Sequence, residues 1–362
     1  MHKMFNPQNP YNELPLLPPD FNLESVDILK AVNRANLALA SLNKAASALP
    51  NPLLLLNSLS MKEAVASSGI ENIHTTTAEA LRAEVLPEKE ILIAQKETLH
   101  YKNALMKGYD LLLKQEFLHT NSFVQIQSIL EPNKPGLRKI PGTKIANSKT
   151  GETIYTPPAG LNVIQDKLKN FENFFNLQDV DPDPLVKTAL LHYQFEAIHP
   201  FLDGNGRTGR ILLVLHLVLT KKIDLPILFI SGYLLDNRSE YYRLLLGVTK
   251  KRAWKEWILY ILQGMEKQSK DTEYTVSQIK KEMEKTEKLI LKKAKAIHSE
   301  ALINFLFTNP FYTQKSIMEN MRIHRNTASK YLNTLHKIGL LKKTAHKKTV
   351  IYYNQPFLRI FS

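Results

Sequence analysis

One stretch of twelve residues constrains this chain more than any other. Residues 199–210 read HPFLDGNGRTGR and contain three glycines and two arginines, directly before the apolar run ILLVLHLVL. Glycine opposes helix formation because its backbone is conformationally free, whereas the apolar run is typical of a helix. The stretch therefore predicts a loop that leads into a helix, which begins near Gly206 and is regular from Thr208 to Leu219.

Such a helix start is a binding site for anions. The first backbone N–H groups of a helix have no partner within it, and together with the helix dipole they attract negative charge. Gly204 and Gly206 allow a ligand to approach the backbone closely, because no Cβ intervenes. Arg207 and Arg210 are three residues apart and share a helix face, so their guanidinium groups suit two successive phosphates.

Three more side chains complete the pattern. Asp203 offers a hard oxygen ligand, suited to a Mg²⁺ ion that bridges phosphates. Asn205 can donate to a phosphate oxygen, and His199 can titrate near neutrality as a general base should. Phe201 is expected to anchor the loop in the core. A plain glycine-rich turn with solvated arginines would not require this full set of residue types at fixed spacing.

The stretch resembles the signature of the Fic family, H-x-F-x-D/E-G-N-G-R-x-x-R, at every defined position. The resemblance implies a helical fold and transfer of AMP from ATP to a Tyr, Thr or Ser hydroxyl of a protein. It implies that His199 deprotonates the target, that Asp203 holds Mg²⁺, and that Arg207 and Arg210 contact the β- and γ-phosphates. The residues that it implies for ATP binding are Glu196, Ala197, Ile198, His199, Gly204, Asn205, Gly206, Arg207, Thr208, Gly209 and Arg210.

Two other segments resemble parts of the same fold. The segment KIANSKTGETIYTPP has a hairpin turn at Lys149-Thr150-Gly151 and resembles the flap that holds the target by strand pairing. Its flap residues are Thr153, Ile154, Tyr155 and Thr156. The segment NRSEYYRLL resembles the one that lines the adenine pocket, with Tyr241 and Tyr242 as contacts. Core packing of either tyrosine stays open, and Thr249 stands where some relatives have an adenine-binding Asn.

A second motif, SSGIEN at residues 67–72, resembles the inhibitory motif S/T-x-x-x-E-G/N of Fic proteins. Ser67, Glu71 and Asn72 are the matching residues, and the resemblance implies that Glu71 pairs with Arg210. A neutralised Arg210 would no longer hold the γ-phosphate, so ATP would bind with a misaligned α-phosphate. The alternatives are a helix-terminal surface glutamate, or a residue that orients a water for AMP removal.

The C-terminal region is strongly basic. Residues 299–362 carry ten Lys and Arg against two Glu, which is more than half of the net charge of +14. They read as helix, turn, helix and hairpin, and resemble winged helix-turn-helix domains, which bind DNA through the second helix and the wing. The candidate DNA contacts are Arg325, Asn326, Thr327, Lys330, Lys347 and Lys348. Solvated surface charge, protein docking and dimer formation remain alternatives.

Periodicity predicts a mainly α-helical protein, a Fic-type helical bundle with a hairpin flap and a small winged-helix domain. Helices are expected over 24–49, 53–69, 75–86, 88–113, 161–175, 185–198, 231–248 and 253–268. The expected domains are an N-terminal region (1–100), a catalytic core (101–265), a connecting helix (266–298) and the basic domain (299–362). With no cysteine, no signal peptide and no apolar run long enough to span a membrane, a cytoplasmic location is the default.

The leading hypothesis is therefore an autoinhibited protein adenylyltransferase that uses Mg·ATP and modifies an unidentified protein or itself. Gly204 and Gly206 favour AMP transfer, because phosphotransferring relatives of the Doc type carry alanine and lysine inside this loop. The alternatives are an ATP-sensing, DNA-binding transcriptional regulator and an enzyme that removes AMP. The sequence leaves the target, its modified residue and homodimer formation open.

Overall fold

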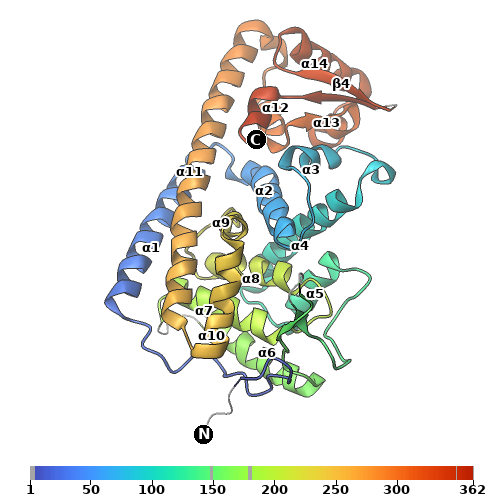
Figure 1. Ribbon diagram of the computed structural model, residues 1–362. Helices are drawn as coiled ribbons and strands as arrows, with labels where there is room; N and C mark the ends of the chain where they lie inside the picture. The colour runs from blue at the N-terminus through green and yellow to red at the C-terminus, as the bar shows by residue number, and fades with distance from the viewer. Residues whose placement is uncertain (1–4, 147–149, 178–181, 348, 362) are drawn as a thin grey trace. The chain divides into compact units, whose positions relative to one another are not determined.

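The structure is a computed structural model that describes residues 5–146, 150–177, 182–347 and 349–361 (Figure 1). The chain forms two compact units. Unit 1 comprises residues 1–40 and 103–268, and unit 2 comprises residues 41–102 and 269–362. The division falls within three helices: α1 (Val26–Ser47), α4 (Ile93–Gln115) and α11 (Trp254–Lys293).

Unit 1 is a helical bundle with one pair of short antiparallel strands. Its further elements are α5 (Thr120–Leu130), β1 (Ile145–Ala146), β2 (Thr153–Tyr155), α6 (Leu161–Asn176), α7 (Pro184–Ile198), α8 (Asn205–Leu219), α9 (Ile230–Asp236) and α10 (Arg238–Lys251). Strand β1 pairs with β2 through Ile145 opposite Tyr155 and Ala146 opposite Thr153.

Helix α8 lies at the centre of unit 1, because its sequence is apolar on every side. Each residue from Ile211 to Leu217 is at most 2% exposed. Helix α7 packs along α8, and α5 and α9 also contact α8 (Figure 1). Helix α7 begins in a well-defined way, since the Asp183 side chain accepts the Leu185 N–H at 2.8 Å and Pro184 needs no N–H partner.

A cluster of aromatic rings fills the space beside these helices. The rings meet edge to face or tilted, with centroids 5.5–6.5 Å apart, a geometry that aromatic pairs prefer. The cluster contains Phe123, Phe171, Phe175, Phe195 and Phe201. It places Phe201, and with it the loop 199–204, against a rigid core.

Unit 2 contains two groups of elements. The first is η1 (Pro52–Leu54), α2 (Leu55–Ile70), α3 (Thr77–Ala83) and η2 (Glu88–Glu90). The second, after η3 (Lys295–Ile297), is α12 (Glu300–Thr308), β3 (Phe311–Tyr312), α13 (Gln314–Met321), α14 (Arg325–Lys337), β4 (Lys342–His346), β5 (Thr349–Tyr353) and α15 (Gln355–Arg359). The three strands form an antiparallel sheet in the order β3-β5-β4.

The structure confirms the mainly helical fold, the flap hairpin and the helix-turn-helix-hairpin order of the basic region. It differs from the expectations in several places. The long helix expected from residue 88 begins at Ile93, and the helices expected over 253–268 and 266–298 are one helix, α11. Helix α5 was not predicted, helix α8 begins at Asn205, and the segment 231–248 is two helices. Asn237 separates them, because its φ of −116° and ψ of 33° are not helical. No helix of the described residues is long and apolar enough to cross a bilayer.

Candidate active site

The loop 199–204 joins the end of α7 to the start of α8. His199 is the first residue past α7, and its φ of 48° and ψ of 58° are left-handed. Its N–H donates to the Phe195 carbonyl at 3.0 Å. A non-glycine residue in this region costs free energy, so the surrounding contacts must hold it there. Ala197 and Ile198, the residues just before it, are buried.

The start of α8 has the geometry that an anion site needs. Gly204 caps the helix with a φ of 76°, which alanine and larger residues rarely adopt. Thr208 closes the first turn, since both its N–H and its hydroxyl donate to the Gly204 carbonyl, at 2.9 and 2.8 Å. The preceding N–H groups of the helix, from Asn205 onward, are directed away from the helix body.

Asn205 closes the loop with its side chain. Its Oδ1 accepts the Phe201 N–H at 2.8 Å, and its Nδ2 donates to the Phe201 carbonyl at 2.9 Å. The side chain is 3% exposed. One N–H of the amide remains to serve a phosphate oxygen, because an amide nitrogen has two donors. Asn205, the first residue of α8, thus fixes the loop that precedes the helix.

The two arginines of the motif are buried on α8. Arg207 is 4% exposed and pairs with the Glu131 carboxylate, while Arg210 is 1% exposed. Glu196 lies against Gly209, where an added Cβ would come within 2.5 Å of the Glu196 Oε1. A larger residue at this position would force the Glu196 side chain to move and would press on the Phe195 ring, 3.2 Å from the added Cβ.

Asp203 is the predicted Mg²⁺ ligand. Its Oδ1 accepts the Gly204 N–H at 2.8 Å and its Oδ2 accepts Lys134 Nζ at 2.7 Å. Partial burial raises the pKa of Asp203, but the contacts with Lys134 and Gly204 outweigh it and lower the pKa, so the carboxylate is charged at neutral pH. No cluster of three or more metal ligands occurs among the described residues. One carboxylate at a phosphate site fits Mg²⁺ that is shared with a nucleotide.

The flap residues lie on and after β2. Tyr155 is buried, and its hydroxyl donates to the Ala197 carbonyl at 2.7 Å. Thr153 and Ile154 are partly exposed, and the Thr156 hydroxyl donates to the Pro7 carbonyl at 2.6 Å. Lys149 of the predicted turn lies outside the described residues, while Gly151 has the positive φ of 72° that such a turn needs.

The N-terminal arm, defined here as residues 5–20, is bound along this side of unit 1. The Tyr11 N–H donates to the Thr156 carbonyl at 3.0 Å. Further along, Asn170 makes hydrogen bonds to both the N–H and the carbonyl of Leu17, at 2.8 and 3.0 Å. The Gln194 side chain donates to the Pro15 carbonyl at 2.8 Å. The arm is therefore held through its backbone by side chains of α6 and α7.

The predicted adenine contacts occupy different environments. Tyr241 is 1% exposed, and its hydroxyl lies 3.0 Å from Nε2 of the buried His192. Tyr242 is 45% exposed, and the Arg238 guanidinium lies 5.8 Å from its ring centre. The structure thus places Tyr241 in the core and leaves Tyr242 accessible to a base.

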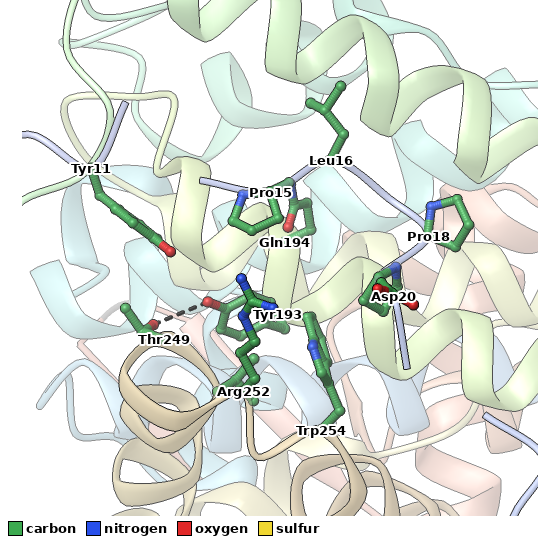
Figure 2. Close-up of a pocket in the computed structure, with 12 residues that line it drawn as sticks. Tyr11, Pro15, Leu16, Pro18, Asp20, Tyr193, Gln194, Thr249, Arg252 and Trp254 are labelled. Atoms are coloured by element: carbon green, nitrogen blue, oxygen red, sulfur yellow. Dashed lines mark hydrogen bonds between the residues drawn. The ribbon is translucent and has the colours of Figure 1, made fainter. Parts of the chain in front are cut away.

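Thr249 lines a cavity of about 310 Å³ between the arm and the ends of α7 and α10 (Figure 2). Its hydroxyl lies 3.0 Å from the Tyr193 hydroxyl, and Arg252 and Trp254 complete that wall (Figure 2). The prolines at 15, 18 and 19 form the opposite wall. The Thr249 hydroxyl is therefore engaged with Tyr193.

The residues of the inhibitory motif end helix α2 in unit 2. Ser67 is fully buried, whereas the side chains of Glu71 and Asn72 are exposed. Glu71 is the C-cap of α2, and Asn72 has a φ of 62°. The Ile73 N–H donates to the Ser68 carbonyl at 3.0 Å, so α2 ends in a tight turn with Asn72 in the left-handed region.

The candidate DNA contacts lie at the start of α14 and in the wing. Arg325, Asn326 and Lys330 are exposed, and Thr327 is partly exposed. Lys347 is exposed at the turn between β4 and β5, and Lys348 lies outside the described residues. The N-terminal end of α14 therefore presents polar and basic side chains to solvent.

Four residues near the loop were not anticipated from the sequence. Gln127 donates to the Asp203 carbonyl at 3.2 Å, and Glu131 and Lys134 pair with Arg207 and Asp203. Arg138 donates to the His199 carbonyl at 2.7 Å. All but Gln127 lie in the Pro- and Gly-rich stretch EPNKPGLR, where three charged residues at 131, 134 and 138 were the available signal.

Two other histidines of unit 1, His192 and His216, are buried in the core. Burial lowers the pKa of His192 and of His216 to about 3. His216 Nδ1 lies 2.7 Å from the Thr188 hydroxyl. Both rings stay neutral at physiological pH, so neither can act as a base that cycles its proton.

Family models match most of the chain. Residues 29–110 match the model described as Fic/DOC family N-terminal, and residues 111–217 match the model described as Fic/DOC family. Residues 283–357 match the C-terminal domain described as protein adenylyltransferase SoFic-like. The arm lies before the first of these matches.

Known proteins show the same relationship. Protein adenylyltransferase fic-1 of Caenorhabditis elegans is 28% identical over 33% of this chain and 23% of its own length. Protein adenylyltransferase Fic of Nematostella vectensis is 29% identical over 43% of this chain and 39% of its own length. The chain thus spans well under half of these relatives.

Solved structures share the fold. A Fic family protein from Desulfovibrio desulfuricans G20 superposes with a TM-score of 0.58 at 17% identity, over 93% of this chain and 98% of that one. Residues 134–508 of Fic-1 from C. elegans superpose with a TM-score of 0.52 at 19% identity, over 68% of this chain and 73% of that one.

Proposed function

Because this chain belongs to the Fic/DOC family, we propose that it is a protein adenylyltransferase that transfers AMP from Mg·ATP to a Tyr, Thr or Ser hydroxyl of a protein. The observation that carries this proposal is the junction of α7 and α8. A histidine held in the left-handed region lies five residues before Gly204, the N-cap of α8. A base and a phosphate site are thereby joined by a loop of five residues, His199 to Asp203.

The groups at this junction suit an in-line displacement. The triphosphate binds at the N–H groups of α8, with Arg207 and Arg210 compensating its charge. His199 accepts the proton of the target hydroxyl, whose oxygen forms a bond to the α-phosphorus as the bond to pyrophosphate breaks. Mg²⁺, when bound at Asp203 and the phosphates, would neutralise charge on the leaving pyrophosphate.

The flap and α10 supply the other contacts of the proposed reaction. The exposed edge of the strand pair β1–β2 offers backbone groups to an extended target segment, which would align its hydroxyl with the base. Tyr242 is the aromatic residue that remains accessible on α10 and would stack on adenine. The target is an unidentified protein or the chain itself.

Autoinhibition by Glu71 is part of the proposal. Glu71 ends helix α2 and carries an exposed carboxylate, which is the group required to pair with Arg210. When Arg210 is neutralised in this way, the γ-phosphate loses its partner and meets a carboxylate of like charge. The same carboxylate could orient a water for the reverse task, removal of AMP from a modified protein.

One experiment tests base, brake and reaction together. Wild type, Glu71→Gly and His199→Ala are incubated with Mg·ATP labelled at the α-phosphate, and intact masses are measured. We expect an AMP-sized increment that grows in Glu71→Gly and is absent in His199→Ala. Equal labelling of wild type and Glu71→Gly would contradict the brake. No increment in any of the three, with ATP still bound, would favour an ATP-sensing regulator or AMP removal.

A second activity, DNA binding, is proposed for the winged helix. Its support is the exposure of Arg325, Asn326 and Lys330 at the start of the second helix of the motif, where base edges are read in such domains. Double substitution of Arg325 and Lys330 by alanine is expected to weaken duplex DNA binding and to reduce its dependence on salt. Binding that is absent, or insensitive to salt, in wild type would contradict this role. The domain would then serve protein docking or a homodimer.

A further inference from the structure

Five consecutive backbone carbonyls around His199 are each held by a hydrogen bond. The Tyr155 hydroxyl donates to Ala197 at 2.7 Å, and Asn205 Nδ2 donates to Phe201 at 2.9 Å. Arg138 serves the three carbonyls between them. Its Nη2 donates to Ile198 at 3.3 Å, its Nε to His199 at 2.7 Å and its backbone N–H to Pro200 at 3.0 Å.

This set of bonds meets two needs at once. The last carbonyls of α7 have no partner within the helix and must be satisfied from outside when they are buried. The turn at His199 has a φ of 48°, which its own side chain does not favour. Donors from outside α7 satisfy the carbonyls and thereby fix the left-handed turn.

Arg138 is unusual for a buried arginine. It is 2% exposed, and burial lowers the pKa of its guanidinium. Its side-chain partners among the described residues are the carbonyls of Pro158, Ile198 and His199. A buried cation usually pairs with a carboxylate. Here the guanidinium group instead donates to three backbone carbonyls, one of His199 itself and one of the residue before it.

We propose that Arg138 and Tyr155 are positioning residues for His199, an inference that rests on the proposed function. They fix the turn from which the imidazole projects, and they act through backbone carbonyls without touching either substrate.

The same two residues couple the base to the flap. Tyr155 is the last residue of β2, and Pro158 follows that strand by three residues. Arg138 also directly follows Leu137, which forms an isolated antiparallel bridge with Phe201. Arg138 and Tyr155 therefore fix the flap and the His199 turn relative to each other. A target segment that pairs with the flap would then have its hydroxyl at a set distance from His199.

The arm supports this anchor from the other side. The Phe5 ring stacks on Tyr155 with centroids 5.9 Å apart, and the Tyr11 ring meets it edge to face at 6.3 Å. These contacts hold the Tyr155 ring in the place from which its hydroxyl donates to the Ala197 carbonyl. The arm thus contributes to the position of His199 although it lies far from it in sequence.

The test uses single substitutions in this chain. Tyr155→Phe removes only the hydroxyl that reaches Ala197. Tyr312→Phe is the matched control, because the Tyr312 hydroxyl is also buried and also donates to a carbonyl near a helix end, that of Leu306 in α12. Arg138→Met removes the fork, and Arg138→Lys restores a single donor. The readouts are kcat for AMP transfer, the calorimetric Kd of Mg·ATP, and the pH dependence of kcat.

We expect Tyr155→Phe and Arg138→Met to lower kcat by roughly 10–100-fold, as a displaced catalytic group does. The Kd of Mg·ATP should change less than twofold, the midpoint of the acid limb of the pH profile should move, and Arg138→Lys should recover part of the loss. Tyr312→Phe should leave kcat unchanged. Equal effects of Tyr155→Phe and Tyr312→Phe, or a loss confined to the Kd of Mg·ATP, would overturn the inference.

A second measurement separates this inference from the proposed function. The protein is labelled with carbon-13 at its histidine rings, and the ring resonances are recorded by NMR. The His199 resonance is assigned as the one that is missing in His199→Ala. If neither the wild type nor Glu71→Gly transfers AMP, the proposed function fails. The positioning role then stands if the His199 resonance and its titration shift in Arg138→Met and Tyr155→Phe but not in Tyr312→Phe, and it falls if they do not shift.

Discussion

Replacement of Gly204 by alanine tests the phosphate site most directly. Gly204 has a φ of 76°, and a Cβ added there would lie 3.0 Å from Cγ of Glu131. A left-handed alanine costs roughly 1–2 kcal/mol. Glu131 must also move by a few tenths of an ångström, and it is the partner of Arg207. The substitution therefore disturbs both the first turn of α8 and one of its arginines.

Gly339→Ala is the matched control. Gly339 lies between α14 and β4 with a φ of 81°, and an added Cβ would meet nothing within 4 Å. It carries the same conformational cost without a steric one, and it belongs to the winged helix. Each variant should lower the Tm of the unit that carries it by roughly 2–8 °C, from 2–4 °C per kcal/mol for units of this size.

The assay combines thermal unfolding with calorimetric titration of Mg·ATP. Gly204→Ala should weaken Mg·ATP binding by about tenfold or more, equivalent to a loss of about 1.4 kcal/mol, because the N–H groups that receive the phosphates move. Gly339→Ala should bind Mg·ATP as wild type does. If Gly204→Ala is destabilised like the control yet binds Mg·ATP normally, the start of α8 is not the phosphate site.

Three further predictions concern the same unit. Asp203→Asn should raise the Mg²⁺ concentration for half-maximal AMP transfer by roughly tenfold or more, with little change in Tm because the side chain is half exposed. Tyr242→Ala should weaken Mg·ATP binding by about tenfold through lost stacking, whereas Tyr241→Phe should mainly lower the free energy of unfolding, by about 1 kcal/mol; equal binding defects would place both rings in the pocket. The pKa values of His192 and His216 are lowered to about 3, so the unfolded chain binds protons that the folded chain does not below pH 6.5. As the pH is lowered below 6.5, the free energy of unfolding should therefore decrease by about 1.4 kcal/mol per pH unit for each histidine. Urea unfolding at pH 7 and pH 5 should show a smaller decrease for His216→Asn than for the wild type.

The local part of the site could be predicted from the sequence because its chemistry is written in consecutive residues. The glycines, Asp203 and Arg207 follow one another, so the helix start could be predicted without knowledge of the fold, and the anion site at that start stays a prediction.

The supporting contacts could not be predicted in this way. Arg138 reaches His199 across 61 residues, and Tyr155 reaches Ala197 across 42. Nothing near either residue in sequence indicates that its partner is a backbone carbonyl. Tyr241 and Tyr242 are adjacent on one helix, and only the packing of α10 on α7 decides that the first is buried. The charged residues at 131, 134 and 138 gave no sign of their partners, because Arg207, Asp203 and His199 lie 76, 69 and 61 residues further along the chain.

The bound arm has a consequence for the order in which the chain can fold. Its partners Asn170 and Gln194 lie 153 and 179 residues after Leu17 and Pro15. During synthesis the arm therefore leaves the ribosome long before the side chains that hold it exist, and long-range contacts of this kind form late. Until α6 and α7 have assembled, the arm remains open to proteases, and the ring of Tyr155 lacks the two aromatic neighbours that restrict it. The surroundings of His199 are thus completed only when a segment synthesised well before α6 and α7 reaches its place.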